Sequence, residues 1–272
     1  MQWGVAVDPY TIVGRVTIGL LAGTLIGLTG IGGGVVLLPM LISILGVPPV
    51  VAVGSDAVIN SITKIGAGTL HWHRGNVSWP LALNLAYGSI PGAVLGVLLL
   101  ARIRAVYGNG VNEVLKVAIA ILLIVIPIAY MLIQFPSASE VNIGSMRDDE
   151  HRLGVTLIGF VAGILVGVTS IGSGSIILML LLVFFGYAPV IMVGTDIVHA
   201  VLLAGITGVL QLGFGNVDLL LVATVLIGSI PGGLLGAYLA KYLPSQRFKQ
   251  TLCSVLVVVG ARMLWMSVSH AK

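Results

Sequence analysis

Long apolar runs follow one another along the whole chain, separated by short stretches of Gly, Pro and charged residues. Most runs reach the roughly 20 residues that a helix needs to cross a bilayer. None alternates regularly between apolar and polar positions, as transmembrane β-strands do. The pattern predicts an all-α polytopic membrane protein, with runs over 10–28, 35–45, 50–72, 79–101, 111–133, 153–170, 176–185, 190–212, 219–239 and 248–266.

The pattern repeats with an offset of 140 residues, so that 23–103 aligns with 163–243 without a gap. The matching motifs are GLTGIGGG with GVTSIGSG, VPPVVAVGSDAV with YAPVIMVGTDIV, HRGNV with GFGNV, and GSIPGAVLG with GSIPGGLLG. Duplicated apolar halves interrupted by glycine are typical of secondary transporters. We therefore predict a first transmembrane repeat over 1–134, a polar linker over 135–152 and a second repeat over 153–272.

The number of spans depends on the first two runs of each repeat. A single helix over 10–45 would be about 54 Å long at 1.5 Å per residue, whereas the hydrocarbon core is about 30 Å thick. One steep, broken helix would give eight spans in two homologous halves of four. A span followed by a re-entrant hairpin would give inverted halves of five segments each.

Loop charge favours about eight spans, because two clusters of positive residues then share one side of the membrane. The positive-inside rule assigns that side to the cytoplasm and both termini to the outside. The clustered residues are Arg102, Arg104, Lys116, Lys241, Arg247 and Lys249.

Composition agrees with a membrane protein, since 58% of residues are hydrophobic and 8% are charged, compared with roughly 25% charged in soluble domains. The net charge of +4 comes without a dense basic cluster, so we expect no nucleic-acid partner. Cys253 is the one cysteine, which excludes a disulfide within the chain and a thiol-rich metal site. We predict no cofactor and no metal.

The glycine interruptions at 27–34 and 167–174 are the first candidate site. Consecutive glycines end a helix, and the next run then begins with free N–H groups and a positive dipole end, which can bind an anion. The alternative is that these glycines only permit close helix packing. The candidate substrate-binding residues are Thr29, Gly30, Gly32, Gly33 and Gly34 in the first copy and Thr169, Ser170, Gly172, Ser173 and Ser175 in the second.

Polar residues along the runs at 50–72 and 190–212 are the second candidate. Asp56, Asn60 and Lys64 are spaced by four and share one helix face, and Asp196 and His199 follow a similar pattern. Ionisable groups within a span indicate function by default. Asn60 and Lys64 are predicted to bind substrate, and the other three to serve coupling or gating. The alternatives are structural roles. Lys64 would pair internally with Asp56, His199 would be a packing residue, and the two aspartates would cap helix starts.

Two further motifs favour structural roles. The GSIPG motifs at 88–92 and 228–232 place a proline inside a span, which kinks a helix and is compatible with a gating pivot. His71, His73 and Arg74 close one span and favour an interfacial anchor, because no third ligand for a metal is in view.

Together these motifs resemble the TauE/SafE sulfite exporter family across nearly the whole chain. The resemblance implies a multi-pass permease of the bacterial inner membrane, with duplicated four-span halves, that moves sulfur-containing organic or inorganic anions, often outward. The family often has GTS where this chain has Gly54-Ser55-Asp56 and Gly194-Thr195-Asp196. These acids are compatible with repelling an anion or coupling a cation.

The sequence thus predicts a secondary transporter that exports small sulfur oxyanions, such as sulfite or organosulfonates, by alternating access between two halves. The alternative is a proton- or metal-cation-coupled permease that uses Asp56 and Asp196. A membrane enzyme or accessory subunit is disfavoured, because no nucleophile–base pair or metal cluster is in view. The expected partners are a small anion and the lipid bilayer, while proton coupling, substrate, direction and a homo-oligomer are left open.

Overall fold

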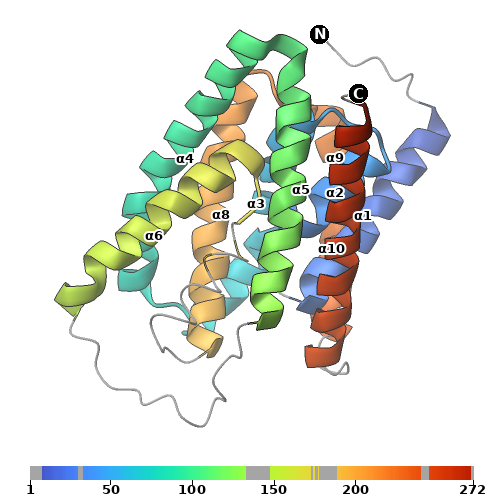
Figure 1. Ribbon diagram of the computed structural model, residues 1–272. Helices are drawn as coiled ribbons and strands as arrows, with labels where there is room; N and C mark the ends of the chain where they lie inside the picture. The colour runs from blue at the N-terminus through green and yellow to red at the C-terminus, as the bar shows by residue number, and fades with distance from the viewer. Residues whose placement is uncertain are drawn as a thin grey trace.

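The computed structural model describes residues 8–29, 33–132, 148–172, 174, 177, 189–239 and 245–270. These residues form helices joined by short turns (Figure 1). The helices are α1 Pro9–Thr29, α2 Gly33–Ser43, α3 Pro49–His73, α4 Trp79–Tyr107, the 3₁₀ turn η1 Gly108–Gly110, α5 Val111–Leu132, α6 Asp148–Thr169, α8 Pro189–Gly213, α9 Leu219–Leu239 and α10 Ser245–His270. The predicted all-α polytopic fold is confirmed.

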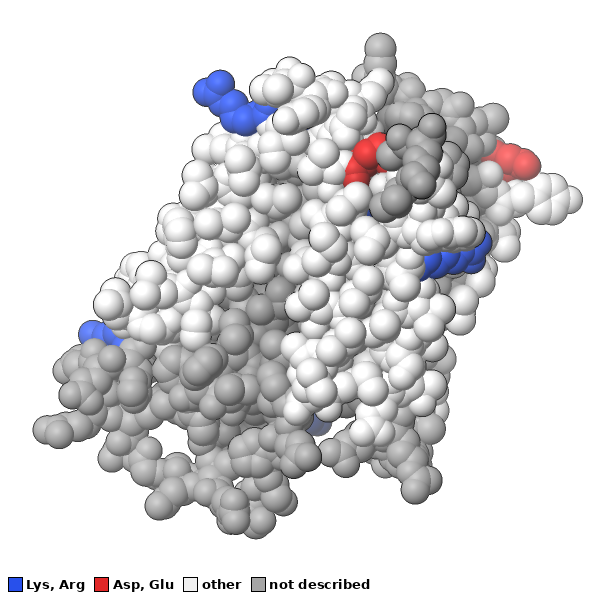
Figure 2. Space-filling view, viewed as in Figure 1, with Lys and Arg blue, Asp and Glu red and all other residues white. Residues whose placement is uncertain are grey.

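Within the described residues, seven apolar helical stretches are long enough to cross a membrane. One of them, Trp79–Leu132, has 54 residues and contains both α4 and α5, which turn back on each other at η1 (Figure 1). This gives eight long helices, as the sequence predicts. The protein is a multi-pass membrane protein, and large apolar side chains such as Tyr87 and Leu132 lie exposed on its outer surface. The face drawn in Figure 2 carries few charged side chains on its described part.

The segment after the first glycine interruption does not cross the membrane. Helix α2 has 11 residues, which is about 16 Å of helix, and it packs against α1 and α3. Val35, Leu37 and Leu38 on α2 are buried in the larger apolar core. This agrees with the rule that interrupted backbone at membrane depth is tolerated where protein covers it. The matching run at 176–185 lies almost entirely outside the described residues.

The two halves run in opposite directions. Helix α1 begins and α10 ends at the end of the molecule where α4 and α5 join; α1 runs away from that end and α6 runs toward it (Figure 1). The inverted arrangement that loop charge disfavoured is therefore the observed one. The predicted clustering of Arg102 and Arg104 with the positive residues around the start of α10 is wrong, because α4 ends and α10 begins at opposite ends (Figure 1).

Glycines bring the two halves into close contact at two helix crossings, α1 with α9 and α4 with α6. A Cβ built on Gly88 would clash with the carbonyl oxygen of Thr156, and one on Gly228 with that of Val16. Further glycines, in pairs 140 residues apart, are in the same close contact with a backbone carbonyl of the crossing helix. The repeat in the sequence therefore corresponds to equivalent helix contacts in the two halves. The glycines are Gly19, Gly23, Gly27, Gly88, Gly92, Gly96, Gly159, Gly163, Gly167, Gly228, Gly232 and Gly236.

These crossings predict opposite effects for two glycine-to-alanine substitutions. Gly88→Ala should lower stability by about 1–3 kcal/mol, because overpacking forces backbones apart. Gly66→Ala on α3 should leave it unchanged or raise it by up to about 1 kcal/mol, since a Cβ there meets no atom within 4 Å. Thermal unfolding in detergent measures both. Equal midpoints for the two variants would contradict the close crossing.

Candidate functional site

Helices α3 and α8 cross near their midpoints, at the centre of the molecule. Ser61 Oγ donates a hydrogen bond of 3.1 Å to the carbonyl oxygen of Val201, and these two residues occupy equivalent positions of the repeat. Gly208 packs closely on α3, because a Cβ there would meet Val58. The polar faces of both helices are therefore brought together in the middle of the bundle.

Asp56 on α3 is fully buried and lies beside the second glycine interruption. Its Oδ2 accepts hydrogen bonds from Asn60 Nδ2 at 2.8 Å and from Ser170 Oγ at 2.7 Å. Ser170 directly follows α6 and has a φ of 58°, a left-handed conformation that costs a non-glycine residue about 1–3 kcal/mol. The fold holds Ser170 in that conformation while its hydroxyl bonds Asp56. The structure therefore brings Asn60 and Asp56 of one helix together with Ser170 of the second glycine interruption.

The start of α2 is pressed against the same group. A Cβ on Gly33 would overlap Asn60 Oδ1, and a Cβ on Gly34 would meet the carbonyl oxygen of Ser170, with Asp56 Oδ2 at 3.1 Å. A carboxylate therefore lies at the positive end of the α2 dipole, a position that stabilises negative charge. The sequence predicted that the start of this helix binds an external anion. In the structure, the carboxyl group of the protein's own Asp56 lies beside that helix start.

Lys64 and Asp196 extend this cluster to α8. Both are buried, Lys64 with 8% and Asp196 with 2% of its surface exposed. Lys64 lies close enough to both Asp56 and Asp196 for an electrostatic interaction. One ammonium group therefore lies within electrostatic range of two carboxyl groups, one contributed by each half. We refer to Asp56, Asn60, Lys64, Ser170 and Asp196 as the central cluster.

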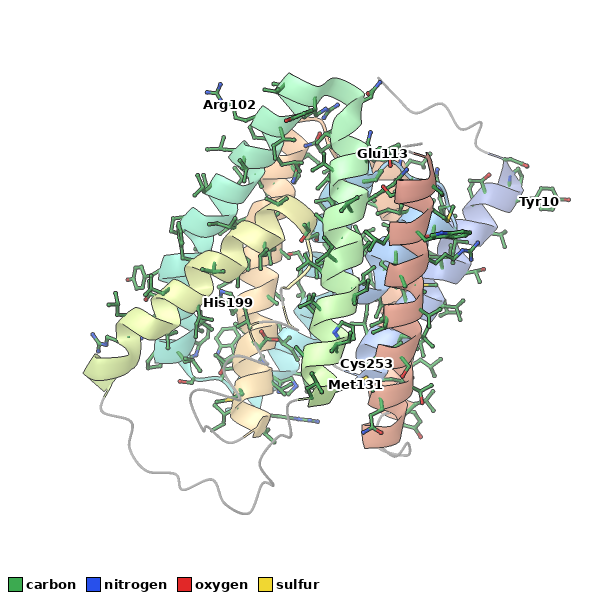
Figure 3. All side chains as sticks on the ribbon, viewed as in Figure 1. Tyr10, Arg102, Glu113, Met131, His199 and Cys253 are labelled. Atoms are coloured by element: carbon green, nitrogen blue, oxygen red, sulfur yellow. The ribbon has the colours of Figure 1, made fainter. Side chains whose placement is uncertain are left out.

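Each central helix is also bonded to the proline-containing helix of the other half. His199 Nε2 on α8 lies 2.7 Å from Ser89 Oγ on α4, and Thr63 Oγ1 on α3 lies 3.0 Å from Ser229 Oγ on α9. Ser89 and Ser229 are the serines of the two GSIPG motifs, which the sequence indicated only as kinks. Figure 3 shows His199 on α8 within the bundle, apart from surface residues such as Tyr10 and Arg102.

The GSD, GTD and GNV motifs form two reciprocal interlocks. Ser55 Oγ accepts a hydrogen bond of 3.0 Å from the backbone N–H of Asp218, and Thr195 Oγ1 accepts one of 2.9 Å from Ser78. The neighbouring glycines, Gly54 and Gly194, pack on the carbonyls of Asn216 and Asn76. Each motif therefore holds the turn that precedes α9 or α4 in the other half. The sequence did not reveal this role, because the partners lie far apart along the chain.

Removing either hydroxyl of the two interlocks is expected to lower the stability of the folded protein, independently of the other. Ser55→Ala and Thr195→Val each leave a backbone N–H of a partly buried turn without its partner, which costs about 1–3 kcal/mol. The double variant should lose the sum, since the two bonds share no residue. Thermal unfolding measures the losses, with Ser254→Ala as control because that hydroxyl bonds its own exposed helix. Losses no larger than the control's would contradict the interlock.

One polar chain distinguishes the two ends of the bundle. Arg104 Nη1 donates to Asn216 Oδ1, Asn216 Nδ2 donates to Gln211 Oε1 at 2.6 Å, and Gln211 Nε2 donates to the Gly167 carbonyl at 3.2 Å. Asn216 and Gln211 are buried. His71 occupies the position equivalent to Gln211, and the repeat therefore differs at its two ends.

The remaining predicted site residues are not observed in contact with the central cluster or lie outside the described residues. Thr169 bonds locally, donating to the Leu165 carbonyl at 2.7 Å and accepting from the Ile171 N–H at 3.2 Å. Gly172 is buried with a φ of 117°. Thr29 ends α1, but its side chain is outside what the structure describes, as are Gly30, Gly32, Ser173 and Ser175.

In the part of the chain that the structure describes, no group of three or more His, Cys, Asp or Glu side chains is arranged to hold a metal ion. The central cluster offers charged groups and hydrogen-bond donors and acceptors. Its groups come from α3, α6 and α8, and thus from both halves.

Comparison with known proteins agrees with this architecture. The sequence model of the family described as Sulfite exporter TauE/SafE matches residues 16–263. The chain is 37% identical to a Bacillus subtilis protein named probable membrane transporter protein YjnA, over 93% of this chain and 99% of the relative. It is 26% identical to another from the same organism, probable membrane transporter protein YunE, over 92% and 96% of the two chains. No solved structure matches the chain. The protein is a membrane transporter, and it belongs to the TauE/SafE sulfite exporter family.

Proposed function

We propose that the protein exports small sulfur oxyanions, such as sulfite or an organosulfonate, and that the central cluster is the substrate site. The observation that carries this proposal is Lys64, a buried cation at the crossing of the two halves. A buried charge is costly and is retained in membrane proteins chiefly where it has a function. The family to which the chain belongs is described by sulfite export.

The surroundings of Lys64 suit a small oxyanion. An oxyanion needs a positive charge and several hydrogen-bond donors, because its oxygens are strong acceptors. Lys64 supplies the charge. Asn60 Nδ2 and Ser170 Oγ are hydrogen-bond donors, and in this structure both donate to Asp56 Oδ2. In the proposal these two groups donate to the Asp56 carboxyl when the site is empty and to the substrate when it is bound. The start of α2 adds a positive dipole end.

The inverted halves supply a route for alternating access. Transporters with inverted repeats bind substrate near the bilayer midplane, between the repeats, and expose it by moving one half against the other. Here the central cluster lies where α3 and α8 cross near their midpoints. The close glycine crossings of α1 with α9 and of α4 with α6 tie each half to the other. In the proposal these tied helix pairs move as units about the central crossing.

The test is a flux assay with the purified protein in liposomes. Radiolabelled sulfite and a radiolabelled alkanesulfonate are each presented at equal pH on both sides, and uptake is compared with that of protein-free liposomes. We expect saturable uptake of at least one of the two, with competition by the other. If the protein moves neither anion above the protein-free rate, the proposed substrate class is wrong. Normal transport by both Lys64→Ala and Gly33→Leu would instead remove the central cluster as its site.

A further inference from the structure

The two carboxyl groups of the central cluster occupy equivalent positions but have different surroundings. Asp56 Oδ2 accepts hydrogen bonds from Asn60 and Ser170. The repeat places Ala200 at the position equivalent to Asn60, and Gly30 at the position equivalent to Ser170. Neither residue has a side-chain donor, so the repeat provides no counterpart of these two hydrogen bonds around Asp196.

The structure agrees with that difference. Asp196 has 2% of its surface exposed, and its Oδ1 is buried without a hydrogen-bond partner among the described residues. Asp56 Oδ1 is likewise without a partner there, but the other oxygen of Asp56 has two. A buried carboxylate oxygen without a hydrogen bond is unfavourable, and a proton or a bound cation neutralises such a group.

Charge balance leads to the same residue. Lys64 is the one basic side chain described in the central cluster, and it faces both Asp56 and Asp196. It can balance one carboxylate, and Asp56 is the better partner because its charge is also stabilised by two donors. With both carboxylates ionised, the cluster would carry one excess negative charge and would repel an anion. With Asp196 protonated, the cluster is neutral.

We infer that Asp196 binds the proton that is carried together with the anion, an inference that rests on the proposed function. When the site is open to water, a proton binds a carboxylate oxygen of Asp196, and the substrate then enters a cluster without excess negative charge. On the other side the anion leaves and the O–H bond breaks, so that the proton returns to water and Asp196 is again a carboxylate. One proton thus accompanies one anion in either direction, so export proceeds where the outward anion gradient exceeds the inward proton gradient.

The titratable groups around Asp196 are few. On α3 they are Asp56, Lys64 and His71, the last of which lies near Gly194 on α8. On α8 itself His199 is adjacent, with Nε2 bonded to Ser89 of α4 and Nδ1 without a partner among the described residues. On α4 and α6, the side chains of Arg102, Arg104 and Arg152 lie toward the helix ends, and that of Tyr87 is exposed on the outer surface. Among the described residues, Asp56 Oδ2 accepts two side-chain hydrogen bonds, whereas Asp196 Oδ1 accepts none.

The test uses an alkanesulfonate, because this anion does not itself titrate near neutral pH. Liposomes containing the full chain are placed in buffer one pH unit more acidic than their interior, at zero membrane potential. Coupling to one proton then drives up to about tenfold accumulation of the anion, since one pH unit corresponds to a tenfold ratio. Asp196→Asn should show no accumulation driven by the pH difference. Glu113→Gln, the same change in an exposed ion pair, should behave as the wild type.

Pronounced accumulation by Asp196→Asn would overturn the inference, and so would accumulation by the wild type that follows a sodium gradient and not a pH gradient. A second measurement does not depend on transport. The pH-difference infrared spectrum should contain a carboxylic acid C=O band that Asp196→Asn lacks and Asp56→Asn retains. If the wild type moves no sulfonate but shows this band, the proposed substrate is wrong and the proton site stands. A band unchanged in Asp196→Asn would remove the proton site whatever is transported.

Discussion

Replacing Lys64 with Gln is expected to abolish anion transport and to lower the stability of the folded protein. The substitution keeps a long polar side chain but leaves two buried carboxyl groups without the cation that interacts with both. Removing one partner of a buried ion pair typically costs about 3–5 kcal/mol. Flux should fall to the protein-free rate, and the thermal midpoint in detergent should fall with it.

A double variant separates the two effects of this change. Lys64→Gln combined with Asp56→Asn removes one positive and one negative charge from the same helix face, and should recover most of the lost stability. It should not recover transport, because the buried cation is still missing. Transport by the double variant at the wild-type rate would show that Lys64 acts only as a structural counter-ion of Asp56.

Gly34→Val should have the second largest effect. A Cβ at this position meets the carbonyl oxygen of Ser170, a backbone atom that cannot move aside by a rotamer change, and it also approaches Asp56 Oδ2 at 3.1 Å. The start of α2 would be pushed away from the end of α6, and the hydrogen bond from Ser170 to Asp56 would be strained. We expect at least a hundredfold loss of transport, since displacements of about 1 Å at a binding site have effects of this size.

Gly14→Val on α1 is the matched control, because a Cβ there meets no atom within 4 Å. It should transport within about twofold of the wild type, with little change in stability, since valine is not a poorer helix former than glycine. Equal transport by the two valine variants would mean that the contact between the two glycine interruptions is not needed. Retained folding of Gly34→Val is checked by its elution as a single species in detergent.

The sequence predicted the helices well, because their signals are local. Each long apolar run lies within a few residues of a helix in the described chain, and the boundaries fall at residues such as Pro49, Gly75 and Gly215 that end or begin helices by their own geometry. The short run after the first glycine interruption was also correct as an element. What it does in the bilayer depends on which helices cover it, and that is a tertiary property.

The relative direction of the halves was the part that sequence reasoning did not reach. Loop charge favoured parallel halves of four, whereas α1 and α6 run in opposite directions (Figure 1). Counting Lys and Arg decides orientation only when they are concentrated on one side. In this chain the inverted arrangement divides them almost evenly between the two ends, so the count gives neither direction nor sidedness.

The candidate site was predicted in part. Spacing by four placed Asp56, Asn60 and Lys64 on one face of α3, because that relation follows from helix geometry. The bond from Ser170 to Asp56 joins residues 114 positions apart, and no local pattern indicates it. The roles of Ser55 and Thr195 in the interlocks were missed for the same reason, although one signal was present: each precedes an aspartate in a motif that occurs in both copies.

The repeat is informative both where its copies agree and where they differ. Glycine crossings and interlocks occur in equivalent pairs and form the shared framework. The copies differ at two positions of the central cluster. The second copy has Ala204 at the position of Lys64 and Ala200 at the position of Asn60. A nearly symmetric frame thus contains an asymmetric set of charges.

The central claim is that a small sulfur oxyanion binds at Lys64, and ligand-dependent thermal stabilisation tests it most directly. A ligand at 100 times its Kd stabilises the folded state by about 2.7 kcal/mol. We expect sulfite or an alkanesulfonate to raise the unfolding midpoint of the wild type, and to leave that of the folded Lys64→Gln, Asp56→Asn double variant unchanged. Equal stabilisation of both proteins by the same anion would contradict the account, because the binding site would then lie elsewhere.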